Sequence, residues 1–413
     1  MLKLNLKSLL ALLRSPAHTG GEASETAETA PTASAQVRVC CLAALLSCAI
    51  APPCNAGDAT DAVFGQIASV TNPASKANAE ALITGIHAYF GQVNAKGGIR
   101  GRQLKLKLLD DGLQASRMAE LTGTLVADPS VLGLLGYLNT PGLQALADQQ
   151  TFARDSIALI APLQGDRRVV SAENVFPLRS GYADEIEALL KELKRWDKDR
   201  ISIVNMTSSF APSVADLAAQ RAEQRGIKVL ARPVVDAANA ASVQAAVTQV
   251  RAVDPKAILL IASGKPAFDF INAVRNDTGA HIPIYGLSVL LHGELVKAVG
   301  LQKARGIVLS QATPYPFIPY QAVVTEYQAA MKTFSPDVPL SFASLEGYLG
   351  AKIAAEALRR AGDQPTRAKV LSALRNFGEY DLGGYSVKYL PGARRGWESV
   401  DLTLIDARGG LAR

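Results

Sequence analysis

The chain has 413 residues, a length typical of two or three domains. Hydrophobic residues make up 48% and charged residues 19%, so a large core can form and a disordered chain is excluded. The formal net charge is +6, but lysine and arginine are spread along the sequence and only 6% of residues are aromatic. We therefore expect no nucleic-acid partner.

All four cysteines lie close together near the start of the chain, at Cys40, Cys41, Cys48 and Cys54. No cysteine occurs from Asn55 to Arg413. A disulfide framework and a cysteine-rich zinc site are therefore excluded from the body of the protein.

An apolar run from Val37 to Ile50 is followed by Cys54-Asn55-Ala56, a small-x-small sequence typical of a cleavage site. The run is shorter than the roughly 20 residues that span a bilayer. The pattern predicts a secretory signal peptide over residues 1–56, with an over-long start, and export to the periplasm. As an alternative, Leu45-Leu46-Ser47-Cys48 resembles a lipoprotein signal, which would anchor the protein through a lipid on Cys48.

Beyond residue 57, short apolar runs alternate with segments whose apolar residues recur at three- and four-residue spacing. The runs predict strands over residues 63–70, 104–108, 131–138, 157–161, 201–206, 228–234, 257–262, 283–287 and 306–310. The periodic segments predict helices over residues 82–93, 116–127, 142–148, 183–195, 213–225, 241–253 and 267–276.

This alternation predicts an α/β fold with two similar lobes, each a parallel sheet covered by helices on both faces. Ligands of open α/β sheets bind outside the carboxyl ends of the strands. We therefore expect the ligand in a cleft between the two lobes.

Enzyme motifs are absent from the sequence. It contains no G-x-G-x-x-G after the first strand, no Walker motif and no G-x-S-x-G elbow. The histidines are scattered without metal-ligand spacing, and Asp110-Asp111 before Gly112 is typical of a turn that caps a helix. We expect no enzyme activity, no cofactor and no metal site.

Polar loops follow three of the predicted strands, at 69–72, 139–142 and 163–165. Their hydroxyl groups, and the free N–H groups where a helix begins, suit an anion such as a ligand carboxylate. Each loop alone could equally be a helix cap. Several of them at one end of the same sheet favour a binding site.

Two motifs carry a family resemblance. The segment from Asn94 to Arg102, followed by a strand and Asp110-Asp111-Gly112, resembles the periplasmic ligand-binding proteins of branched-chain amino acid ABC transporters. Residues 344–348 (Ser-Leu-Glu-Gly-Tyr) and 381–384 (Asp-Leu-Gly-Gly) support it. The resemblance implies the type I periplasmic binding protein fold, with three crossings between lobes near Arg179, Thr313 and Ser386. Lobe 1 would comprise residues 57–179 and 313–385, and lobe 2 residues 180–312 and 386–413.

The resemblance also implies a ligand site. Thr140 and its neighbours would hold a carboxylate through the hydroxyl and backbone N–H groups, and other residues would line both lobes. In lobe 1 these residues are Ser69, Thr71, Asn139, Thr140, Pro141, Gly142, Leu163 and Gln164. In lobe 2 they are Tyr182, Ser209, Phe210, Gly264 and Ser288.

The sequence departs from the amino-acid binders of this family near Ser288. Those proteins carry a carboxylate there for the ligand's ammonium group, whereas this chain reads Gly286-Leu287-Ser288-Val289. Burying an ammonium group without a counter-charge costs several kcal/mol. The departure predicts a carboxylate-bearing ligand without a free amino group, such as an aliphatic or aromatic acid.

The resemblance implies a monomeric solute-binding component of an ABC importer, which closes its lobes on a small molecule and delivers it to an inner-membrane permease. An alternative is a periplasmic sensor subunit that presents a ligand to a receptor or a histidine kinase. An exported α/β enzyme would need a catalytic constellation that the sequence lacks.

Overall fold

The computed structural model describes residues 61–72, 75–207, 210–236, 238–276 and 282–413. The predicted signal peptide, its cleavage site and Cys48 lie outside these residues, as does Ser209. Within the described part of the chain, no helix combines the length and the apolar character needed to cross a bilayer.

The first sheet has five parallel strands in the order β2-β1-β3-β4-β5. They are β1 (Ala62–Ile67), β2 (Leu104–Leu109), β3 (Val131–Leu135), β4 (Leu159–Ile160) and β5 (Val175–Phe176). All five residues of β3, Val-Leu-Gly-Leu-Leu, are buried. Such a continuous apolar strand is typical of a parallel sheet covered on both faces.

Consecutive residues of this sheet face opposite sides and join two different hydrophobic clusters. Leu134 packs in one cluster and Leu135 in the other. The helices on the Leu134 side are α2 (Ala115–Ala127), α3 (Thr140–Asp148), α4 (Thr151–Arg154) and α5 (Arg167–Val170). Those on the Leu135 side are α1 (Lys76–Asn94), α12 (Ala322–Phe334), α13 (Phe342–Arg360) and α14 (Arg367–Arg375).

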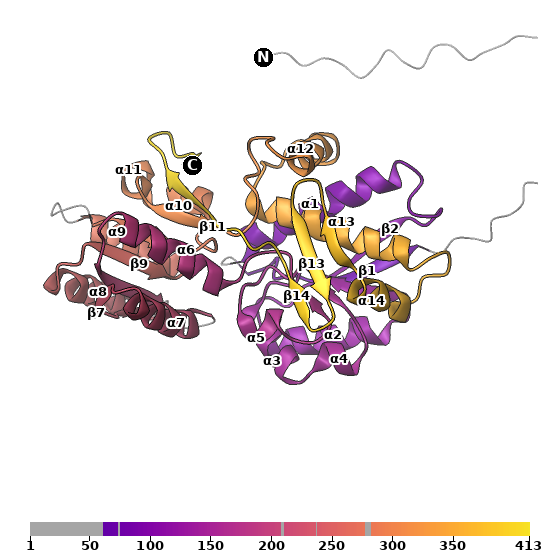
Figure 1. Cartoon of the computed structure of the whole chain (residues 1–413), viewed down its shortest axis with the longest axis horizontal. Helices are drawn as coiled ribbons and strands as arrows, with labels where there is room; N and C mark the ends of the chain where they lie inside the picture. The colour runs from indigo at the N-terminus through magenta and orange to yellow at the C-terminus, as the bar shows by residue number, and fades with distance from the viewer. Residues whose placement is uncertain (1–60, 73–74, 208–209, 237, 277–281) are drawn as a thin grey trace, which may run out of the picture. The chain divides into compact units, whose positions relative to one another are not determined.

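Helices α1 and α13 lie side by side although they are far apart in the sequence (Figure 1). Two glycines allow this close packing. A Cβ on Gly85 would lie 1.8 Å from the carbonyl oxygen of Ser344, and one on Gly347 would lie 2.0 Å from that of Leu82. Any side chain at these positions would therefore push the two helix backbones apart.

The second sheet has the order β16-β15-β11-β10-β9-β6-β7, and β8 also pairs with β6. Its parallel strands are β6 (Arg200–Met206), β7 (Lys228–Ala231), β8 (Val234–Val235), β9 (Ala257–Ile261), β10 (Ile284–Gly286) and β11 (Val308–Gln311). Two antiparallel strands, β15 (Asp401–Ile405) and β16 (Leu411–Ala412), complete it.

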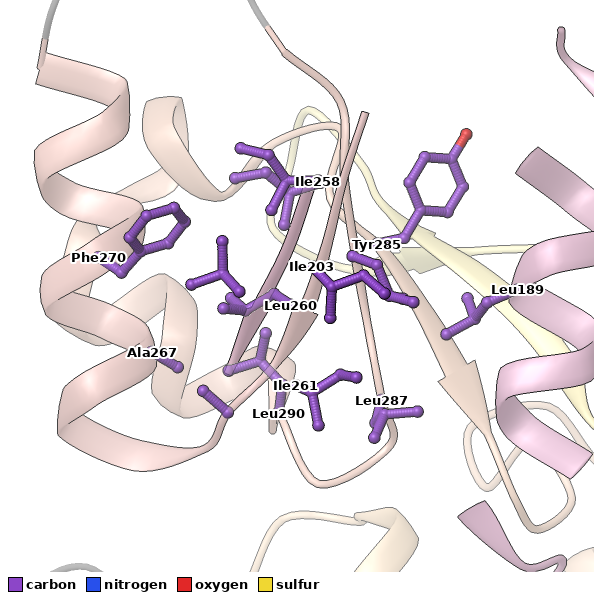
Figure 2. Packing of buried hydrophobic residues seen from close by; sticks show 14 of the residues in the cluster. Leu189, Ile203, Ile258, Leu260, Ile261, Ala267, Phe270, Tyr285, Leu287 and Leu290 are labelled. Carbon is purple, nitrogen blue, oxygen red and sulfur yellow. The ribbon is translucent and has the colours of Figure 1, made fainter. Parts of the chain in front are cut away.

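Helices cover both faces of the second sheet. Figure 2 shows Ala267 and Phe270 pointing at the strands from one side and Leu189 from the other. The helices are α6 (Tyr182–Arg195), α7 (Ala211–Gln224), α8 (Ala240–Ala252), α9 (Gly264–Asn276), α10 (His292–Val299) and α11 (Leu301–Ala304). We call each sheet with its helices a lobe.

The expected α/β fold with two sheets is confirmed, and every strand and helix expected between residues 63 and 310 is present with shifted ends. One expectation needs correction, because only the first sheet is purely parallel. The helices between β11 and β15 pack in the first lobe, so no crossover helix on the second sheet sets the direction of β15, and it pairs antiparallel.

A small third sheet has the order β12-β13-β14, made of β12 (Gly378–Asp381), β13 (Ser386–Leu390) and β14 (Ala393–Arg395). Val387 and Tyr389 of β13 belong to the hydrophobic cluster of α1 and α13. The predicted lobe boundaries stay predictions. This packing favours a third crossing after Arg395 over one near Ser386.

The α1–α13 packing predicts opposite effects for two glycine substitutions. Gly85→Ala should lower the free energy of unfolding by about 1–3 kcal/mol, because the added methyl meets backbone atoms. The matched control is Gly123→Ala in α2, where nothing lies within 4 Å and alanine should stabilise the helix by about 0.5–1 kcal/mol. Chemical denaturation measures both, and equal effects would contradict the packing argument.

Candidate ligand-binding site

The N-terminus of α3 follows directly from the carboxyl end of β3. Asn139 caps the helix, since its Oδ1 accepts a hydrogen bond from the backbone N–H of Gly142 at 3.1 Å. Pro141 lies in the first turn, where a missing N–H costs nothing. A Cβ at Gly142 would lie 2.6 Å from the sulfur of Met118, so a larger residue there would displace that side chain.

Thr140 keeps two hydrogen-bond donors that the described part of the chain does not use. Gln164 uses its Oε1 to accept the N–H groups of Gly165 and Asp166, both at 2.9 Å, so its Nε2 is the group that donates to Thr140 Oγ1 at 2.7 Å. The proton of the Thr140 hydroxyl is therefore available for a further hydrogen bond. Its backbone N–H has no partner in the part of the chain that the structure describes.

These two donors lie at the positive end of the α3 dipole. Both Thr140 and Gln164 are buried, with exposed fractions of 8% and 1%. Two donors and a helix N-terminus in a protected position suit the two oxygens of a carboxylate.

Ser69 and Asn139 are brought together by the buried carboxylate of Asp111. Ser69 Oγ donates to Asp111 Oδ1 at 2.5 Å, and Asn139 Nδ2 donates to Asp111 Oδ2 at 2.7 Å. Within the protein, Asp111 thus uses the Ser69 hydroxyl proton and one of the two side-chain N–H groups of Asn139.

Thr71 is exposed and donates to Asp110 Oδ2 at 2.6 Å. Burial raises the pKa of Asp110, but this hydrogen bond and those from the N–H groups of Gly112 and Val70 outweigh it, so the pKa lies below its usual value. The acidic pair Asp110-Asp111 therefore organises its own loop, as the sequence indicated.

Tyr182 and Phe210 form an aromatic pair, with ring centroids 4.7 Å apart. The N–H of Tyr182 donates to the carbonyl oxygen of Gly165 at 3.0 Å, which joins the start of α6 to the Gln164 loop. Gly165 was missed by sequence reasoning. A Cβ there would lie 2.9 Å from Tyr182, so this contact needs a glycine.

Ser288 lies against a buried acid that the sequence did not reveal. Its N–H donates to Glu185 Oε2 at 2.9 Å and its hydroxyl donates to Glu185 Oε1 at 3.0 Å. Arg179 donates to the same hydroxyl oxygen. The available signal was the position of Glu185 on the apolar face of α6, between Tyr182 and Leu189.

Two remaining candidates, Leu163 and Gly264, make no hydrogen bond to these residues in the described part of the chain. Leu163 donates its N–H to the carbonyl oxygen of Tyr137 at 2.8 Å and packs against the first lobe. Gly264 begins α9 with a φ of +59°, and nothing lies within 4 Å of its Cβ position. Their role in binding stays a prediction.

No group of metal-ligating side chains occurs within the described ranges. A cavity of about 520 Å³ lies at the opposite end of α3, lined by Ala147, Asp148, Gln150, Phe152, Ala153, Arg167, Arg168, Ser171, Ala172 and Glu173. It contains none of the predicted ligand residues. The unused donors of Thr140 lie instead at the N-terminus of α3, and their role in binding stays a prediction.

Known proteins share this fold over nearly the whole described chain. The family model described as "periplasmic binding protein" matches residues 63–409. An extracellular ligand-binding receptor from Verminephrobacter eiseniae is 27% identical with a TM-score of 0.77, covering 86% of this chain and all of its own. A search of curated proteins finds no significant match.

Two further solved structures, each under 25% identical, show the fold alone. One is a possible leucine/isoleucine/valine-binding protein from Rhodopirellula baltica, 24% identical with a TM-score of 0.77, covering 86% of this chain and 97% of its own. The other is a fatty acid ABC transporter substrate-binding protein from Thermomonospora curvata, 18% identical with a TM-score of 0.76, covering 86% and 91%. With two helix-covered sheets, polar loops at the strand ends and a family match from residue 63 to 409, the chain belongs to the periplasmic binding protein family.

Proposed function

We propose that the chain is the solute-binding component of an ABC importer and binds a small carboxylate-bearing molecule that lacks a free amino group. The observation that carries the proposal is the pair of unused donors on Thr140 at the N-terminus of α3. An oxyanion accepts both donors and is favoured by the helix dipole.

The second lobe supports the absence of an amino group. The carboxylate nearest to Ser288 is Glu185, whose two oxygens already accept four donors: the Ser288 N–H and hydroxyl, the Ser310 hydroxyl and Arg179. Its charge also faces the guanidinium of Arg179 at 3.3 Å. A ligand ammonium would therefore find no free acid at Ser288 and would lose its hydration without compensation.

The Tyr182–Phe210 pair supports an apolar ligand body. Both rings are almost fully buried, and Tyr182 contacts the loop of Gln164 through Gly165. An aliphatic or aromatic acid would place its carboxylate at Thr140 and its carbon skeleton near these rings.

The proposed mechanism involves no covalent chemistry. The ligand shifts an equilibrium between open and closed lobes in proportion to its preference for the closed form. A permease in the inner membrane would then recognise the closed form. In the alternative role, the same closure would be read by a receptor or a histidine kinase.

A thermal-shift panel tests the ligand class. Amino acids are paired with their keto, hydroxy and deaminated counterparts, together with simple aromatic acids. A ligand at 100 times its dissociation constant adds about 2.7 kcal/mol, which raises the unfolding midpoint by several degrees. Acids without an amino group should raise the midpoint. Leucine or valine stabilising the protein more than its deaminated analogue would contradict the proposed class.

Thr140→Val tests the carboxylate position. The substitution keeps the side-chain shape and removes the donor, so affinity for the acid found in the panel should fall by about 1–3 kcal/mol, which is roughly 5- to 160-fold. Thr140→Ser should retain most of the affinity. The matched control is Thr124→Val, since the Thr124 hydroxyl bonds only within α2, to the carbonyl oxygen of Glu120. Isothermal titration measures each affinity. If Thr140→Val binds the acid as tightly as the wild type, the Thr140 hydroxyl has only a structural role.

A further inference from the structure

A buried ion-pair cluster joins the two lobes at Arg179. The guanidinium lies 3.3 Å from Glu185 Oε1 of α6 and 3.4 Å from Glu346 Oε1 of α13. The exposed fractions of the three side chains are 4%, 0% and 7%. Because α6 packs in the second lobe and α13 in the first, Arg179 contacts one carboxylate from each.

The backbone beside Arg179 ties the chain crossings together. The N–H of Ser180 donates to the carbonyl oxygen of Ala312, and its hydroxyl donates to that of Trp397 at 2.8 Å. Trp397 in turn donates its N–H to the carbonyl oxygen of Leu178 at 2.8 Å. Arg179 therefore lies where three segments that run between the lobes meet.

The cluster holds two carboxylates and one guanidinium, an excess of one negative charge. Both oxygens of Glu185 are engaged by Ser288, Ser310 and Arg179. In the described part of the chain, Glu346 contacts Arg179 alone, and no hydrogen bond to its carboxylate is present. An uncompensated buried charge is costly, and a proton on Glu346 would remove it.

Among the described residues that face Glu346, none besides Arg179 supplies a positive charge or a free hydrogen-bond donor to its carboxylate. They are Arg179 from the crossing, Glu185 from α6, and Tyr385 from the turn between β12 and β13. The Tyr385 hydroxyl donates its hydrogen bond to the carbonyl oxygen of Leu178 at 2.8 Å, so this donor is not available to Glu346. Arg179 is shared with Glu185 and thus compensates Glu346 only in part.

The electrostatics agree with this geometry. Burial raises the pKa of Glu346 to about 7; Arg179 opposes the shift and Glu185 adds to it. Since the pKa in the folded state lies above the ordinary value, the folded protein binds a proton that the unfolded chain releases. This contribution to stability is complete at low pH and is lost as pH rises through about 7.

We propose that Glu346 is a proton-binding positioning residue, whose charge state decides whether Arg179 is shared between the two lobes or left to Glu185 and Ser288 of the second lobe. Ionised Glu346 competes for the guanidinium and ties α13 to the first crossing. Neutral Glu346 releases it. This change in the partners of Arg179 needs no bound ligand. The proposal is therefore independent of the proposed function.

Trp397 provides a local probe of this proton. Its indole stacks on the ring of Tyr385, with centroids 4.6 Å apart and an interplanar angle of 19°. The sequence has two tryptophans, and the other, Trp196, is 59% exposed. In a Trp196→Phe background, fluorescence therefore reports on the surroundings of Trp397 and Tyr385, next to the Arg179 cluster.

The experiment uses protein expressed from the full-length gene and purified after export. Fluorescence of Trp397 and the thermal unfolding midpoint are followed from pH 5.5 to 8.5. We expect a single transition near pH 7 in fluorescence, and a midpoint about 2 °C higher at pH 6 than at pH 8. Glu346→Gln should abolish the fluorescence transition and flatten the stability profile.

Two kinds of control make the outcome decisive. Glu356→Gln removes a carboxylate from the same helix, where it pairs with Arg359 and Arg360, and should leave the transition intact. Glu346→Asp keeps a titrating group and should retain a transition with a displaced midpoint. This variant supplies the test even where Glu346→Gln unfolds.

Three results would overturn the proposal. In the first, the wild-type fluorescence shows no transition with pH. In the second, the transition survives in Glu346→Gln. In the third, the transition disappears in His87→Gln or in His292→Gln. Burial lowers the pKa of both histidines, which moves their titration away from the expected transition, and these substitutions check that neither causes it.

Discussion

The carboxylate of Asp111 is the interaction on which the candidate site depends. It is fully buried, and it accepts hydrogen bonds from Ser69 after β1, from Asn139 after β3 and from the N–H of Leu113 in its own loop after β2. Three neighbouring strand ends are thereby held to one another. Because Asn139 also caps α3, the same carboxylate fixes the direction in which that helix presents its N-terminus. A buried polar network with all its members paired is rigid, which keeps the Thr140 donors in place before any ligand arrives.

The second lobe uses the same device with a different residue. Glu185 is also fully buried and accepts hydrogen bonds from Ser288 after β10 and from Ser310 in β11. In each lobe, then, one acid collects the donors at the carboxyl edge of the sheet. The difference is that Glu185 comes from the helix that begins just after the first crossing, so its network includes Arg179 and reaches the first lobe through Glu346. The hydrogen bonds of Asp111 thus stay within the first lobe, whereas the network of Glu185 extends through Arg179 to Glu346 of the first lobe.

Sequence patterns predicted the two-sheet architecture well, because continuous apolar strands and periodic helices report local burial directly. The strands from β1 to β11 follow that rule, and the Asn139–Gly142 turn was recognisable from its capping residues. The position of Glu185 on the apolar face of α6 indicated burial, but its role could not be assigned because its partners are not visible in the local sequence. Those partners, Ser288 and Ser310, lie more than 100 residues away. The antiparallel β15 escaped prediction for a similar reason, as its pairing depends on a distant strand edge and not on its own composition.

The Ser288 hydroxyl has an evolutionary consequence. It donates to Glu185 and accepts from Arg179 at once, so both of its hydrogen-bonding capacities are used inside the protein. A descendant that acquired an acid at this position through Ser288→Asp would place a second carboxylate against Glu185, inside a cluster that already carries excess negative charge. Such a mutation would be accepted only after Glu185 or Glu346 had lost its charge. An acid at position 288 therefore requires an earlier substitution at Glu185 or Glu346, and neither of these is among the predicted ligand residues.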